Sequence, residues 1–222
     1  MLERWDRVAP LTGIGTVVLW ILAVVVLEGA GSPPNDDPTP QALQEYFQSD
    51  ENSIYVGAVL FFIGAAILIW WSGALRASIA AAGDVGERLG AIAFGAGVAT
   101  AVLAMGSVAP QVAAAFTANE SDAELAPEAA QALWAAGDGF FVATEFTAAL
   151  LLVTTAIAIL RTRLLPVWWA WISLVIAVVL LIPPIGWAAI IFGMPIWILV
   201  TSVLLYRRPV AGRPIERPIT PA

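Results

Sequence analysis

The chain has 222 residues, of which 60% are hydrophobic and 12% are charged, with a mean hydropathy of +0.86 and a formal net charge of −7. A typical globular domain is about 45–50% apolar and about 25% charged, so this composition predicts a single integral membrane domain. The sequence has no cysteine, histidine or lysine, and all ten cationic side chains are arginine. These absences exclude the usual zinc and haem ligands, a Ser-His-Asp triad, a retinal-type Schiff base and a P-loop lysine. We therefore expect no metal or cofactor, and no enzymatic activity.

Apolar segments of about 20 residues, the length needed to cross about 30 Å of hydrocarbon, predict six transmembrane helices. Their predicted bounds are 8–27, 54–75, 89–109, 139–160, 165–182 and 187–206. The last two come from one apolar block that we divide at the Pro-Pro-Ile-Gly run of residues 183–186, because proline lacks a backbone donor and favours a turn. The sequence thus predicts an all-α integral membrane protein over residues 1–206, followed by an arginine- and proline-rich tail over residues 207–222.

The distribution of arginine predicts the orientation. With six spans, all arginines fall on one side of the membrane, while the opposite loops are acidic and have no basic residue. Positively charged loops stay in the cytoplasm, so both termini are predicted to be cytoplasmic. The first apolar segment is longer than the core of a signal peptide and is interpreted as a retained helix. The composition, rich in alanine and valine and free of lysine, suggests a GC-rich genome and hence a bacterial plasma membrane. No basic surface suits nucleic acid.

The first acidic loop, residues 36–53, contains the signals of a short amphipathic helix. Thr39 is a candidate cap, Pro40 suits a first helical position, and Leu43, Tyr46 and Phe47 follow at near-helical spacing. We expect this helix to lie against the outer rim of the bundle.

Tryptophans gather near the predicted membrane boundaries, as in an aromatic belt. Those near the inner boundary are Trp5, Trp70, Trp71, Trp168, Trp169 and Trp171, and those near the outer one are Trp134 and Trp187. Trp20 and Trp197 fall nearer mid-span, where packing between helices is the favoured explanation.

The third predicted helix is rich in small residues. They form two series, Ala91, Gly95 and Ala99, and Ala93, Gly97 and Ala101. Such series let helix backbones approach closely in lipid, so this helix is expected to be central, and either series is a candidate contact for a protein partner or a second copy of the chain. Pro110, beside Gln111, is expected to kink or end the helix near the outer boundary.

The polar residues at the start of the fourth predicted span form the candidate functional site. Asp138 and Glu145 are seven residues apart, so they share one helix face about 10 Å apart along the axis. Glu145 would lie within the hydrocarbon, where an ionised carboxylate costs at least about 2.5 kcal/mol and marks a functional site by default. We consider three states for it: protonated and bonded to a Thr, Ser or Gln, in contact with a water-filled cavity, or bound to a cation or a partner's basic group. Gln111 completes the candidate polar set, while Asp138 is also explained as an interfacial residue or cap.

Several catalytic interpretations fail on the residues present. The Gly137-Asp138 pair lacks the rest of the GxGD element and a second membrane-embedded aspartate, which a shared-proton carboxylate pair requires. Asp138 and Glu145 alone supply too few ligands for a metal. The glycine pairs at the segment starts match no phosphate-binding loop.

The chain resembles uncharacterised six-helix bacterial membrane proteins that carry a domain of unknown function. The resemblance rests on the acidic first outer loop, on GALRASIAAAGDVGERLGAIAFGAGVA (residues 73–99) and on RTRLLPVWWAWISLVIAVVLL (residues 161–181). It brings no established activity. We therefore predict a non-enzymatic membrane protein that binds membrane lipids or a partner in an assembly. The alternative is a small proton- or cation-linked transporter or channel that uses Glu145.

Overall fold

The computed structural model describes residues 8–29, 38–49, 51–121 and 124–208, and these residues form helices and turns without a strand. In chain order the elements are the 3₁₀ turn η1 (Ala9–Leu11), α2 (Thr12–Gly29), α3 (Pro40–Ser49), α4 (Glu51–Ala80), α5 (Asp84–Asn119), α6 (Pro127–Thr162), α7 (Val167–Leu180), α8 (Pro183–Ala188), the π-helical turn η2 (Ala189–Gly193) and α9 (Met194–Tyr206). The predicted all-α fold is confirmed. Of the predicted tail, only Arg207 and Arg208 lie within the described residues.

Five helical segments are long and apolar enough to cross a membrane. They are Ala9–Leu27, Glu51–Ala80, Asp84–Asn119, Pro127–Thr162 and Pro184–Tyr206. The sixth predicted span, 165–182, forms a helix of only 14 residues, α7, which is about 21 Å long and shorter than the hydrocarbon layer. The six-span arrangement therefore stays a prediction, with α7 as the short member.

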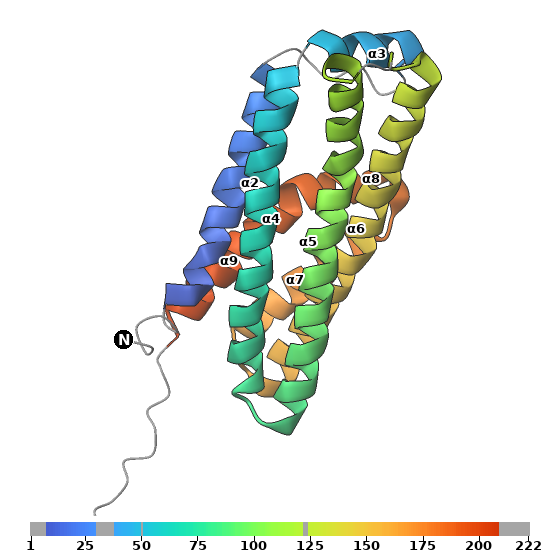
Figure 1. Ribbon diagram of the computed structural model, residues 1–222. Helices are drawn as coiled ribbons and strands as arrows, with labels where there is room; N and C mark the ends of the chain where they lie inside the picture. Colours follow the sequence, from blue (N-terminus) through green and yellow to red (C-terminus); the bar gives the residue numbers. More distant parts are fainter. Residues whose placement is uncertain (1–7, 30–37, 50, 122–123, 209–222) are drawn as a thin grey trace, which may run out of the picture.

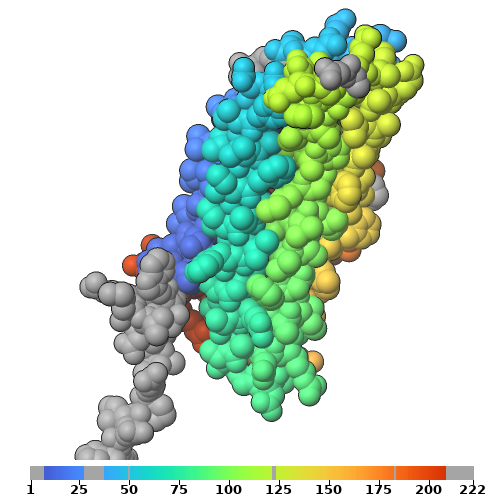
Figure 2. Space-filling view, viewed as in Figure 1, coloured from blue at the N-terminus to red at the C-terminus, as the bar shows by residue number. Residues whose placement is uncertain are grey.

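The helices form two layers of unequal height (Figure 1). The long helices α2, α4, α5 and α6 stand side by side in chain order, and α7, α8 and α9 pack behind their lower half. Seen from the front, the four long helices form a continuous surface (Figure 2). Their outward side chains are apolar, with Ile21 and Val25 of α2 more than half exposed, as expected for a surface that faces lipid.

The two ends of the bundle differ in charge. We call one end the arginine end: it holds the α4–α5 turn, the α6–α7 turn and the end of α9, with every arginine of the described residues. The opposite end, the α3 end, is covered by α3 (Figure 1). Because η1 packs against α9, the chain enters and leaves the bundle at the arginine end.

The α3 end has its own hydrophobic core, most of which lies beyond the predicted spans. The predicted helix over residues 36–53 is confirmed as α3: the Ala42 N–H donates to Thr39 Oγ1 at 3.3 Å. Its Leu43 and Phe47 are fully buried against α4, α5 and α6. Because α5 and α6 each have 36 residues, they are about 54 Å long and exceed the hydrocarbon thickness by about 24 Å. This core stabilises the excess length.

Hydrogen bonds between buried tryptophans and hydroxyl groups join α7 to α9 and α9 to α4. The bonds run from Trp71 to Ser202 at 2.9 Å, from Trp169 to Thr201 at 3.0 Å and from Trp197 to Ser173 at 2.8 Å. The packing explanation for Trp197 is therefore confirmed, and Trp20 also packs, stacked on Phe61 at 5.5 Å.

The aromatic belt was predicted wrongly for three residues. Trp71 is fully buried and Trp169 is only 3% exposed, so both belong to the core. A tryptophan near a boundary faces lipid or protein according to its helix face, which the position along the chain does not reveal. Trp70, Trp168 and Trp171 are each more than half exposed, as a belt requires. Trp187 is also exposed, but it follows Gly186 on α8 at the level of Glu145 and not at the α3 end.

Helix α5 packs against α4 and α6 along its length, but it lies in the front layer, and α6 makes the main contacts with α7 and α8 behind it (Figure 1). The expected central place is therefore that of α6. The series Ala93, Gly97 and Ala101 is buried within the chain, where Gly97 meets Ser72 of α4. Ala91 and Gly95 are exposed, so a contact with a second chain through that series stays a prediction. Of the two outcomes expected at Pro110, a kink or the end of the helix, the end is wrong, because α5 continues to Asn119. Packing against both neighbours and the α3-end core supports the helix past the missing donor.

We predict that Ser202→Ala lowers the free energy of unfolding by about 1 kcal/mol, because it leaves the buried Trp71 N–H without an acceptor in the membrane interior. Ser72→Ala is the matched control: Ser72 is also buried, but its hydroxyl donates only to Leu68 of its own helix. Thermal unfolding of the purified protein in one detergent measures both variants. Equal losses would show that the bond between α4 and α9 adds no stability.

Candidate functional site

Glu145 is the one acidic or basic side chain that the structure buries within the described residues. It lies on α6 and is 3% exposed. No hydrogen bond or ion pair holds its carboxyl group to another described side chain, so the predicted partnership with a Thr, Ser or Gln is not formed. The nearby Thr144 hydroxyl donates instead to Phe140 O at 2.8 Å.

Asp138, on the same face of α6, is exposed. The difference follows from the height of the second layer. The chain of α7 turns into α8 beside Glu145, and this hairpin covers only the lower half of α6 (Figure 1). Seven residues above Glu145, about 10 Å along the axis, the same face is uncovered. Asp138 and Glu145 therefore share one face of α6, as the spacing predicts. The α7–α8 hairpin covers the part of this face that holds Glu145 and leaves the part that holds Asp138 open.

The third predicted site residue, Gln111, does not join Glu145. Its Nε2 atom lies 3.9 Å from the position that a Cβ would take at Gly137. Gly137 is eight residues from Glu145 on α6, or about 12 Å along the axis. Gln111 is half-buried at the level of Asp138, so the predicted polar set divides into an upper pair and a lone glutamate below.

The carboxyl group of Glu145 instead meets the backbone where α7 turns into α8. A Cβ at Gly186 would lie 2.7 Å from Glu145 Oε2 and 2.9 Å from the carbonyl oxygen of Leu180. Only glycine leaves room for the carboxyl group at this point. No three His, Cys, Asp or Glu side chains of the described residues gather as a metal site.

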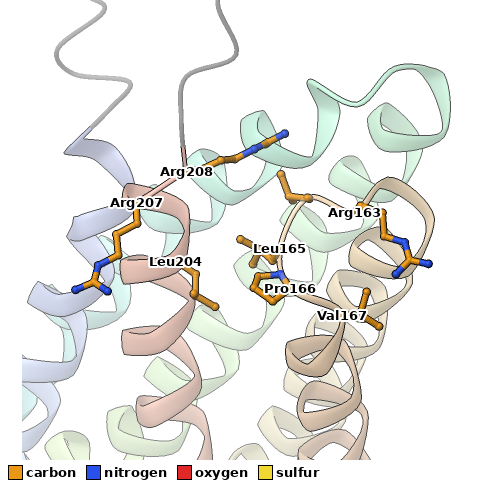
Figure 3. A pocket seen from close by; sticks show the side chains of 8 residues that line it. Arg163, Leu165, Pro166, Val167, Leu204, Arg207 and Arg208 are labelled. Carbon is orange, nitrogen blue, oxygen red and sulfur yellow. The ribbon is translucent and has the colours of Figure 1, made fainter.

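A second candidate site is a pocket of about 450 Å³ at the arginine end. Arg163 comes from the α6–α7 turn, and Arg207 and Arg208 come from the end of α9 (Figure 3). Between them lies an apolar floor that includes Leu165, Pro166 and Leu204. No carboxylate forms a salt bridge with these three arginines in the described part of the chain.

Arg163 has an unusual backbone conformation. Its φ of 55° and ψ of 27° place it in the left-handed region, where it closes the end of α6 through an N–H bond to Ile159 O at 2.9 Å. Among the described residues it is the only non-glycine residue with positive φ. Glycine is the usual residue at such a helix end, and a side chain there costs about 1 kcal/mol. An arginine is thus kept at a position that stability alone would give to glycine.

The sequence analysis missed both of these arrangements. From the sequence, the tail that begins at Arg207 could lie along another protein or anionic lipid, and Arg163 was explained only as a flank of its span. The pocket forms because the α6–α7 turn and the end of α9 meet at the same end of the bundle. Gly186 was used only as a turn signal. The run Leu-Leu-Ile-Pro-Pro-Ile-Gly, residues 180–186, inside an otherwise apolar block was the available signal for a special backbone site.

No protein family, curated protein or solved structure matches the chain. The resemblance to uncharacterised six-helix membrane proteins therefore stays a prediction. The function is inferred from the two candidate sites alone.

We predict that Gly186→Ala destabilises the protein, because its methyl group would press on both Glu145 Oε2 and the Leu180 carbonyl. Gly139→Ala is the control, since a Cβ there would meet no atom within 4 Å, and removing a helical glycine stabilises by about 0.5–1 kcal/mol. Thermal unfolding in detergent measures both. Adding Glu145→Ala to Gly186→Ala should recover part of the loss, and no recovery would show that Glu145 does not contact this turn.

Proposed function

We propose that the protein is a non-enzymatic, multi-pass membrane protein that binds an anionic lipid at its arginine end, as a component of a bacterial plasma membrane. The observation that carries this proposal is Arg163, held in a left-handed conformation at the rim of a pocket shared with Arg207 and Arg208. A residue kept in an unfavourable backbone conformation points to a role other than stability.

The chemistry of the pocket suits a phospholipid headgroup above its acyl chains. Arginine offers several N–H donors in a planar fork that fits phosphate oxygens. The floor of Leu165, Pro166 and Leu204 is apolar, so it suits the glycerol and upper acyl region of the same molecule. Basic pockets between transmembrane helices on the cytoplasmic side are typical sites for anionic headgroups.

The orientation that we propose supports the same ligand. With the arginine end in the cytoplasm, as the positive-inside rule predicts, the pocket faces the leaflet that is rich in anionic lipid. Both described chain ends, at Val8 and Arg208, then lie on the cytoplasmic side.

A second candidate function is a small proton- or cation-linked transporter or channel. It is favoured by the burial of Glu145 at the foot of an open face of α6. Acidic residues buried in membrane domains line proton and ion pathways.

For the lipid proposal, we predict that the triple variant Arg163→Gly, Arg207→Gln and Arg208→Gln binds a short-chain phosphatidylglycerol roughly 10- to 100-fold more weakly than the wild type. Each arginine near an anionic headgroup contributes about 1 kcal/mol, and about 1.4 kcal/mol is tenfold in affinity. Native mass spectrometry of the detergent-solubilised protein gives the affinities, with phosphatidylcholine of the same chain length as the neutral comparison.

The matched control is Arg76→Gln, Arg88→Gln and Arg161→Gln, which removes the same charge from exposed sites at the same end outside the pocket. This control should keep most of the affinity. Equal weakening in both triples would mean a diffuse basic rim and would contradict the pocket. Arg163→Gly alone should bind less lipid while it unfolds at a higher temperature.

For the second candidate, we predict that proteoliposomes of the wild type dissipate an imposed pH gradient or a cation gradient faster than empty liposomes. Glu145→Gln should return the rate to that of empty liposomes, while Asp138→Asn, at an exposed position, should lower it less. A wild-type rate equal to that of empty liposomes for protons, sodium and potassium would remove this candidate.

A further inference from the structure

The turn between α7 and α8 leaves one buried carbonyl group without a backbone donor. A helical carbonyl normally accepts from the N–H four residues later, or three residues later at a helix end. For Leu180 these positions are Pro183 and Pro184, which have no N–H. The N–H of Ile185 donates to Ile182 O at 3.0 Å, and that of Gly186 donates to Ile182 O at 2.9 Å. Leu180 itself is fully buried.

The group that faces this carbonyl is the carboxyl of Glu145. Both Glu145 Oε2 and Leu180 O lie within 3 Å of the same point, the position of a Cβ at Gly186. No described side chain donates a hydrogen bond to either oxygen. The space therefore brings together two acceptors and no donor. Two acceptors without a donor repel each other unless a proton or a cation lies between them.

The surroundings contain no charge that would balance an ionised carboxylate. α7, α8 and η2 contain no titratable residue, and α9 has only Tyr206 at its far end. α5 has no titratable residue between Arg88 and Glu120, near its two ends. On α6 itself the nearest groups are Asp138, about 10 Å away along the axis, and Arg161, about 24 Å away.

We propose that Glu145 and the Leu180 carbonyl form a proton-binding site, in which the protonated carboxyl group donates its O–H to the orphan carbonyl at the break between α7 and α8. A proton fits better than a metal cation. Divalent cations take six or more oxygen ligands, and this space offers one carboxyl group and one carbonyl. The proline pair removes the competing donors, and Gly186 provides the space. The site is independent of the lipid pocket at the arginine end.

The open part of the α6 face leads from Glu145 toward Asp138. Asp138 is exposed and lies about 10 Å from Glu145 along the axis. When the proton leaves, the O–H bond breaks, and the carboxylate and the carbonyl repel each other across the same space. The α7–α8 turn must then move away or admit water, so the site couples proton release to the position of the hairpin.

The test is infrared spectroscopy of the full chain in lipid nanodiscs, which separates the C=O stretch of a protonated carboxyl group from the bands of a carboxylate. We expect a protonated carboxyl band at pH 7 in the wild type, shifted by carboxyl-¹³C glutamate and absent in Glu145→Gln. Asp138→Asn is the control and should keep the band. Pro184→Ala restores a backbone N–H that can donate to Leu180 O. In this variant the Glu145 carboxyl band should therefore shift to the frequency of a more weakly hydrogen-bonded carboxyl group.

Two results would overturn the proposal. The first is a wild-type spectrum at pH 7 without a protonated glutamate band, whether the band is absent from the start or disappears when sodium is added. The second is a band that persists in Glu145→Gln. The first result is measured on the isotope-labelled wild type alone, so the test stays valid even where Glu145→Gln folds poorly. Lipid binding that stays normal in Glu145→Gln separates this site from the lipid pocket.

Discussion

The hydrogen bonds between indole N–H groups and hydroxyls around α9 are the constraint on which the rest of the structure depends. Lipid offers helices no hydrophobic drive toward one another, so directional bonds and close packing must choose the partner and the register. Trp71, Trp169 and Trp197 each donate to a Ser or Thr on another helix. Together they tie α4, α7 and α9 into one unit. A slide of α9 by one residue along its axis would break the bonds at Thr201 and Ser202 together.

These bonds also fix the height of the α7–α9 hairpin. With α7 and α9 held at the level of Trp197 and Ser173, the 14 residues of α7 end beside Glu145 and not at the α3 end. The hairpin thereby divides one face of α6 into a covered part and an open part. Burial of Glu145 and exposure of Asp138 are two consequences of the same short helix. The chemistry of the site thus depends on packing several turns away.

Local signals in the sequence predicted some elements well. α3 followed from a cap, a proline and three apolar side chains within one short loop, all of which act over neighbouring residues. The path of α5 through Pro110 could not be predicted in this way, because contacts with α4 and α6 decide whether a helix survives a missing donor. The depth of Glu145 was predictable from its place in the span, but its burial in protein and its neighbours Leu180 and Gly186 were not. They come from a turn in a distant part of the chain. The length of α7 determines the level along α6 at which that turn lies.

The excess length of α5 and α6 has a mechanical consequence. Both helices are continuous from the arginine end, past Glu145, to the core under α3. With the predicted spans 89–109 and 139–160, 10 residues of α5 and 12 residues of α6 extend past the membrane at the α3 end, an arm of about 15–18 Å. A tilt of about 10° within the membrane would carry α3 sideways by about 3 Å for an arm of this length. Small adjustments at the level of the α7–α8 turn would thus be magnified into a displacement of α3.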